Sequence, residues 1–224
     1  MNIRSFTIKL VGIVLTLGTL TQSGFAYNKA ALTYLKANKK VQGPNPGHLD
    51  FSLANLSGIN LSNADLRGAN FCGADLTGAN LSGANFSNTT LRGNFSRANF
   101  NGANLSGATL HGDMSYANFN YANLYKAKLQ HVSIIGATFR EADLSGVDFF
   151  CSDIRNVDFS NTNLTFASFL GVKKTGDPRY LNVSDWNSVN FNGADIGGAY
   201  FHGCQISNED LIKKGALNVE KTTR

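Results

Sequence analysis

The sequence predicts a solenoid, a chain that winds into a coil of short repeated segments, and three observations support this fold class. Between Phe51 and Phe169 a large apolar residue recurs almost every five positions, beginning with Phe51, Leu56 and Leu61. Two residues before most of these central residues lies an alanine, and the position between is usually Asn or Asp. A period of five fits neither a helix, at about 3.6, nor a strand, at about 2. The chain is therefore expected to turn a corner every five residues.

The repeated motif is A(D/N)LXX, with X any residue, and in this motif the chain resembles the pentapeptide-repeat family. The resemblance covers about 150 of the 224 residues. It implies an all-β fold, a right-handed quadrilateral β-helix in which four pentapeptides make one coil, with short helical caps expected at its ends. It implies little about activity, because function has to be argued from a site and not from a fold.

The segment from Met1 to Ala26 has the composition of a secretory signal peptide. Arg4 and Lys9 give a positive start, and residues 10–20 form an apolar run that is short for a membrane span. Small residues precede a cleavage point after Ala26. We therefore expect an exported protein, periplasmic or secreted, whose mature chain has no membrane span; an uncleaved anchor is the alternative.

Charge is unevenly distributed along the chain. The formal net charge is +5, and removing Arg4 and Lys9 leaves +3. Residues 27–47 hold four lysines and no acid, whereas residues 48–170 hold seven basic and nine acidic residues. A nucleic-acid binder should show a basic stripe. DNA mimicry with topoisomerase inhibition, known in some members of the family, needs a strongly acidic surface. The near-neutral repeat argues against a nucleic-acid partner and makes DNA mimicry the least favoured reading.

Successive central residues can be assigned to four faces of the coil: Phe51 to face one, Leu56 to face two, Leu61 to face three and Leu66 to face four. Coils stack at the strand spacing of ~4.8 Å, so only a small side chain fits beside each large one. Face three then carries a column of phenylalanines that should stack as the structural core. These are Phe100, Phe119, Phe139 and Phe159.

Two irregular steps fall at the same corner of adjacent coils. From Leu91 to Phe95 and from Leu110 to Met114 the step is four residues instead of five. Both lie between faces one and two, which keeps the stacking intact and predicts a locally pinched edge. The Asn or Asp before each central residue is expected to hydrogen-bond the corner backbone, and so to serve the fold rather than chemistry.

The five-residue repeat is interrupted after Phe169 and resumes at Trp186 or Phe191. Coil ends expose unpaired strand edges and need covers, and Ser207 with Asp210 has the spacing of a capping box before Leu211, Ile212 and Leu217. The predicted units are a signal peptide (1–26), an N-terminal cap segment (27–47), the β-helix (48–170), an inserted loop (171–185), a final coil (186–206) and a C-terminal cap and tail (207–224).

One weak chemical candidate lies on face one. His131 and Cys151 fall in the same outward column of adjacent coils, about 5 Å apart at the backbone, with His111 one coil below. A thiol beside an imidazole can form a reactive thiolate or part of a metal site. The site is convex and has no third orienting group, so we expect solvated side chains, no metal, no cofactor and no enzymatic activity. Cys72 lies too far from Cys151 for a disulfide, and Cys204 takes an inward small position, which predicts three free thiols.

A candidate binding surface lies beside the inserted loop. Phe150 and Leu170 are neighbours on face one and should be exposed, next to Lys173, Lys174, Arg179 and Tyr180 in the loop; alternatively the loop folds over them. The favoured function is an exported non-enzymatic scaffold or protein-interaction module with a protein or envelope-polymer partner, in a monomer or an oligomer. A thiol or metal protein using His131 and Cys151 is the alternative.

Overall fold

The computed structural model describes residues 50–170, 186–202, 204 and 206–222, together with two short strands near the N-terminus. These strands, β1 (Thr7–Leu10) and β2 (Ile13–Thr16), pair antiparallel. The rest of the predicted signal peptide, the N-terminal cap segment and the inserted loop lie outside the described residues.

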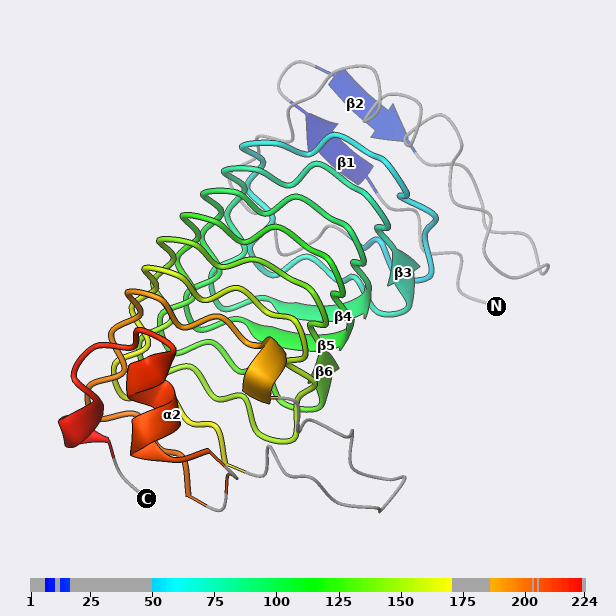
Figure 1. Ribbon diagram of the computed structural model, residues 1–224. Coiled ribbons are helices and arrows are strands. Elements are labelled where there is room, and N and C mark those ends of the chain that lie inside the picture. The colour runs from blue at the N-terminus through cyan, green and yellow to red at the C-terminus, as the bar shows by residue number, and fades with distance from the viewer. Residues whose placement is uncertain are drawn as a thin grey trace.

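The repeat forms a rod of stacked coils, with the C-terminal helices at one end (Figure 1). Parallel bridges join residues that lie one coil apart, such as Asp50 with Asn70 and Asn118 with Thr138. Most coils therefore consist of four sides of five each, as predicted. A coil with a short step has one side of four, as the bridge from Asn99 to Asn118 shows.

Each side of the coil ends in a turn built from the same backbone bonds. In the first side the N–H of Ala54 donates to the carbonyl of the central residue Phe51 at 3.0 Å, and the corner residue between them, Leu53, has a φ of +57°. A positive φ at this position is the feature of a type II turn. The Asp50 side chain accepts from the N–H of Ser52 at 3.0 Å, so the expected role of the Asx position in the turn is confirmed.

The interior is a column of large side chains beside a column of small ones. The central residues and alanines of the repeat are buried along the whole rod. On face three Phe100 stacks on Phe119 with ring centroids 4.7 Å apart, and Phe119 stacks on Phe139 at 4.8 Å. Phe159 continues this stack at 5.4 Å. The predicted phenylalanine column is therefore confirmed.

The stack also continues across the insertion. Phe191 stacks on Phe159 at 5.6 Å, and Asp158 bridges Asn190, which lies beyond the insertion in the chain. Trp186 opens the short 3-10 helix η2 (Trp186–Ser188) and is buried. The predicted return of the register therefore holds, and the insertion lengthens one coil without disturbing its neighbours.

The two four-residue steps lie in a four-stranded parallel sheet. Strands β3 (Ala74–Asp75), β4 (Thr90–Asn94), β5 (Thr109–Asp113) and β6 (Val132–Ser133) pair in parallel in that order. Where one residue is missing the chain runs extended through the corner instead of turning. A Cβ at Gly93 would overlap the carbonyl oxygen of Ala74, and one at Gly112 would overlap that of Gly93, so this approach requires glycine.

The last coil is closed by the C-terminal segment. Helix α2 (Asn208–Lys213) begins with the predicted capping box between Ser207 and Asp210. Leu211 is buried, whereas Ile212 and Leu217 are exposed. After α2 the carbonyl of Gly215 accepts from Gly193 at 2.8 Å and that of Leu217 from Ile196 at 3.2 Å. This pairing, continued to η3 (Val219–Lys221), covers the open strand edge.

We predict that Gly93→Ala destabilises the rod more than Gly102→Ala. Gly93 faces a backbone carbonyl that cannot move aside, so overpacking should lower the free energy of unfolding by about 2–3 kcal/mol. Gly102 has a φ of +64° but nothing within 4 Å of an added Cβ, so its variant should lose only about 1 kcal/mol from backbone strain. Urea unfolding curves measure both, and equal losses would contradict the close-approach argument.

Candidate functional site

The candidate residues of face one lie along the sheet of β3 to β6 and along the coils that follow this sheet toward the C-terminus. The outward residue just after each central residue forms one column, which holds Cys72, Arg92, His111, Phe150 and Leu170. Strands β4 and β5 fix this alignment, because Arg92 pairs with His111 in their register. His131 stands beside this column at a corner position, with a φ of +54°. The register of the coils therefore puts these residues on one face.

For Phe150 the sequence left two alternatives, an exposed ring or one covered by the inserted loop. Its ring meets the His131 imidazole edge to face, with centroids 5.5 Å apart and an interplanar angle of 87°, and its side chain is half-buried. Leu170 is exposed, with 41% of its surface accessible. Lys173, Lys174, Arg179 and Tyr180, the other predicted contact residues, lie outside the described residues.

Cys151 is buried, which corrects the expectation of a solvated thiol. Only 4% of its surface is accessible, and the neighbouring Asp153, also at an outward position of the repeat, is buried as well. Most outward residues elsewhere on the rod stay at least partly accessible, so this corner of face one is locally enclosed. His131 remains exposed, and the two groups therefore do not present a joint thiol–imidazole site to solvent.

His111 has its own electrostatic environment. Burial lowers the pKa of its imidazole, and the positive charges of Arg92 and His131 lower it further. A positive surrounding also disfavours a bound cation. In the part of the chain that the structure describes, no three His, Cys, Asp or Glu side chains come close enough to hold a metal ion together. None of the three cysteines forms a disulfide; Cys72 is exposed and Cys204 partly buried.

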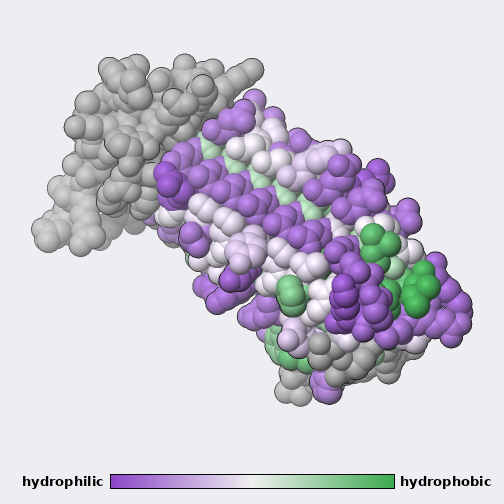
Figure 2. Space-filling model, turned by 90° about the vertical axis from the view of Figure 1, so that its left-hand side faces the viewer, coloured by the Kyte–Doolittle hydropathy of each residue, from purple (hydrophilic) through white to green (hydrophobic). Residues whose placement is uncertain are grey.

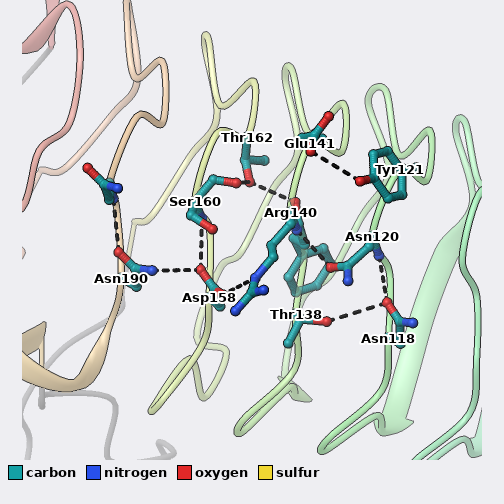
Figure 3. Close-up of polar contacts among 12 residues, drawn as sticks. Asn118, Asn120, Tyr121, Thr138, Arg140, Glu141, Asp158, Ser160, Thr162 and Asn190 are labelled. Atoms are coloured by element: carbon teal, nitrogen blue, oxygen red, sulfur yellow. Dashed lines mark hydrogen bonds and ion pairs between the residues drawn. The ribbon is translucent and has the colours of Figure 1, made fainter.

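A polar ladder runs along face three (Figure 3). Arg140 forms an ion pair with Asp158 in the next coil, with Nε 2.6 Å from Oδ2. Asn190, a further coil on, donates to Asp158 Oδ1 at 2.8 Å. On the other side the backbone N–H of Arg140 donates to Asn120 Oδ1 at 2.9 Å. These contacts hold side chains of successive coils in fixed positions.

The ladder favours the charged form of the Asp158 carboxyl. Burial alone would raise its pKa, but hydrogen bonds from Arg140 and from Ser160, with the Arg140 charge, outweigh burial and lower the pKa below its usual value. The ladder is thus an acid-sensitive part of the scaffold and not a pair of carboxylates prepared for catalysis.

Several large apolar side chains are exposed toward the C-terminal end, in addition to Leu53 and the mid-rod tyrosines Tyr116, Tyr121 and Tyr125. Figure 2 shows a largely hydrophilic flank with hydrophobic residues gathered near that end. Phe166 is 67% accessible and sits at a corner with a φ of +58°; a Cβ at Gly198 in the next coil would lie 2.6 Å from its ring. The other exposed members of this region are Leu170, Tyr200, Ile212 and Leu217.

A shallow hollow of about 290 Å³ lies at the other end of the rod, where face four meets face one. It is lined by residues of adjacent coils, among them Asn70, Cys72, Asn88, Thr90 and Arg92. No sequence motif marks this hollow, since its lining residues come from two adjacent coils.

The repeat itself decides the family. A profile described as pentapeptide repeats matches the chain in eight copies over residues 54–93, 94–112, 113–149 and 142–173, more than half of its length. The chain belongs to the pentapeptide-repeat family. Members of this family fold as right-handed quadrilateral β-helices, which confirms the predicted fold class. Pentapeptide-repeat proteins are generally structural or interaction modules.

Solved structures of the family resemble the chain at low identity. HetL, a protein involved in heterocyst differentiation regulation in the cyanobacterium Nostoc sp. strain PCC 7120, is 23% identical, with a TM-score of 0.42; the match covers 76% of this chain and 80% of HetL. QnrB1, a plasmid-mediated fluoroquinolone resistance protein, is 16% identical, with a TM-score of 0.35 and coverage of 79% and 92%. A pentapeptide-repeat protein of the Arabidopsis thaliana thylakoid lumen is 24% identical, with a TM-score of 0.20 and coverage of 59% and 77%.

A comparison with curated proteins found no match. No helix in the described residues of this pentapeptide-repeat protein has the length and hydrophobicity that crossing a membrane requires.

We predict that Asp158→Asn makes the stability of the protein less dependent on acid. The pKa of Asp158 is lower in the folded than in the unfolded chain, so its contribution is present above the unfolded pKa, near 3.8. That contribution is lost as pH falls through the folded pKa. At pH 7 the variant should be less stable by about 0.5–1 kcal/mol, the range for a partly exposed ion pair, and this difference should shrink toward pH 3. Urea unfolding at pH 7, 5 and 3 measures it, and a constant difference would contradict the assignment.

Proposed function

We propose that this protein is an exported, non-enzymatic scaffold that binds a protein or envelope-polymer partner through the C-terminal half of face one and its corner. The observation that carries this proposal is the exposure of Leu170 and Phe166 on a rod with a largely hydrophilic flank. Exposed apolar residues of this size, gathered in one region, are typical of interaction sites.

The rigidity of the rod supports a binding role. Corner residues are fixed by hydrogen bonds to the next coil, as Phe166 is by its N–H bond to the carbonyl of Gly197 at 3.0 Å. A backbone held in this way has little conformational freedom left to lose on binding, so more of the contact energy appears as affinity. Leu170 stands on the same scaffold, directly after the buried Phe169.

Electrostatics and accessibility favour this role over the two alternatives. The burial of Cys151 removes the accessible thiol that a reactive-thiol or metal function would use. The near-neutral repeat lacks the acidic surface that DNA mimicry needs. Export is proposed from the composition of residues 1–26 alone.

Affinity capture from envelope extracts tests the proposal. Leu170→Asp should lower recovery of the partner about tenfold, because a buried contact residue of this size is worth roughly 1.4 kcal/mol or more. Leu53→Asp is the matched control, because Leu53 is 51% accessible at a corner of the same face near the opposite end. A chain lacking residues 171–183 tests the insertion. Equal recovery of the partner with all variants would contradict the proposed binding surface.

Localisation is tested separately. Fractionation should place the protein outside the cytoplasm, with Tyr27 as the first residue of the mature chain. A cytoplasmic protein whose first residue is Met1 or Asn2 would refute export and would leave the proposed binding surface untested by this result.

A further inference from the structure

We propose that the hollow between faces four and one is an anion site, which takes a single phosphate or carboxylate group on the Arg92 guanidinium. This site lies near the N-terminal end of the rod, away from the surface proposed above, and does not depend on it.

The register of the repeat leaves Arg92 without a carboxylate. Other arginines directly after a central residue pair with an aspartate directly before one: Arg67 with Asp65 at 2.7 Å and Arg155 with Asp153 at 2.6 Å, both in the same coil. Arg140 reaches the equivalent aspartate of the next coil.

Around Arg92 the same positions are all neutral. Thr90 stands before its own central residue, Asn70 occupies that position one coil earlier, and Thr109 occupies it one coil later. Among the described residues the Arg92 guanidinium forms neither a hydrogen bond nor an ion pair. A guanidinium that is exposed and unpaired in a built recess is available for an external anion.

The lining of the hollow offers donors and no carboxylate. The Asn70 amide is already engaged, since it donates to Asp50 at 3.0 Å and its oxygen accepts from the N–H of Cys72. The Thr89 hydroxyl is also engaged, accepting from the N–H of Gly68 at 3.0 Å. The remaining polar side chains of the lining are the Cys72 thiol, the Asn88 amide, the Thr90 hydroxyl and Arg92.

The positive charge of Arg92 affects a neighbouring residue on face one, His111. Its guanidinium contributes to the lowered pKa of His111, after the larger effect of burial. The planar fork of a guanidinium binds the oxygens of phosphate or carboxylate through two parallel bonds. A volume of about 290 Å³ lies at the lower limit for ligand pockets, roughly 300 Å³. The hollow therefore accommodates one such group, free in solution or at the end of a larger molecule.

Cys72 provides a reporter inside the hollow, because it lines the recess and its thiol is free and exposed. The full-length protein is treated with anionic iodoacetate or neutral iodoacetamide, and alkylation of Cys72 is followed by peptide mass spectrometry. Attraction by Arg92 should favour iodoacetate. Arg92→Met should lower the iodoacetate-to-iodoacetamide rate ratio about threefold, the size that Coulomb attraction over several ångströms gives in partly screened solvent.

Two variants make the test specific. Thr90→Asp supplies the carboxylate that the other arginines have and should lower the ratio as Arg92→Met does. Arg97→Met removes an exposed arginine of the same coil whose guanidinium lies over the Tyr116 ring at 5.6 Å, and should leave the ratio unchanged. Circular dichroism and thermal unfolding establish that each variant is folded.

Competition identifies the anion. Inorganic phosphate and acetate are added separately, with sodium chloride at equal ionic strength as the control for screening. The site is supported if phosphate or acetate protects Cys72 from iodoacetate more than chloride does, and if this protection is lost in Arg92→Met. The anion that protects more strongly is the preferred ligand. A rate ratio unchanged in both Arg92→Met and Thr90→Asp, or no protection beyond chloride, overturns the proposal.

Discussion

The hydrogen bonds between stacked coils are the constraint on which the rest of the structure depends. Corner N–H groups donate to the coil above, as that of Leu53 does to the Cys72 carbonyl at 2.8 Å, and Asx positions are bridged to their equivalents. The coil spacing of ~4.8 Å admits only one large and one small side chain per side in the interior. Sequence and structure are therefore linked position by position, with one neighbour below and one above for each residue inside the rod.

This constraint explains which irregularities the rod tolerates. Deleting one residue at the corner of a single coil would misalign it with its neighbours, but deletions in adjacent coils produce a matched pair of strands, β4 and β5. The insertion after Leu170 leaves from a corner, so the next coil resumes with Phe191 stacked on Phe159. Stability depends on each coil meeting its neighbours in register, and connections outside the register cost little.

The same constraint decides what could be predicted from the sequence. The face-three phenylalanines, the Asx turns and the capping box at Ser207 follow from local spacing, and the sequence predicted them. Burial of Cys151 and partial burial of Phe150 did not follow, because the repeat fixes where an outward residue lies but not what surrounds it. The outward positions repeat in space but not in chemistry, so their environment is known only from the structure.

The Arg92 hollow, by contrast, can be inferred from the sequence once the register is known, because Thr90, Asn70 and Thr109 are all uncharged. A motif search along the chain misses it, since these neighbours lie a full coil apart.

Interior and corner positions of the coil are thus under different constraints, side-chain size in the interior and backbone conformation at the corners. An interior residue that changes size disturbs two coils, whereas a corner admits glycine, asparagine, lysine or phenylalanine, provided that its backbone accepts a positive φ. Phe166 bears the strain of that conformation, roughly 1–2 kcal/mol relative to glycine, and leaves most of its ring in water. Neither property helps the chain to fold. Glycine fits the same turn in many other coils, so the turn alone does not dictate which residue stands at this corner.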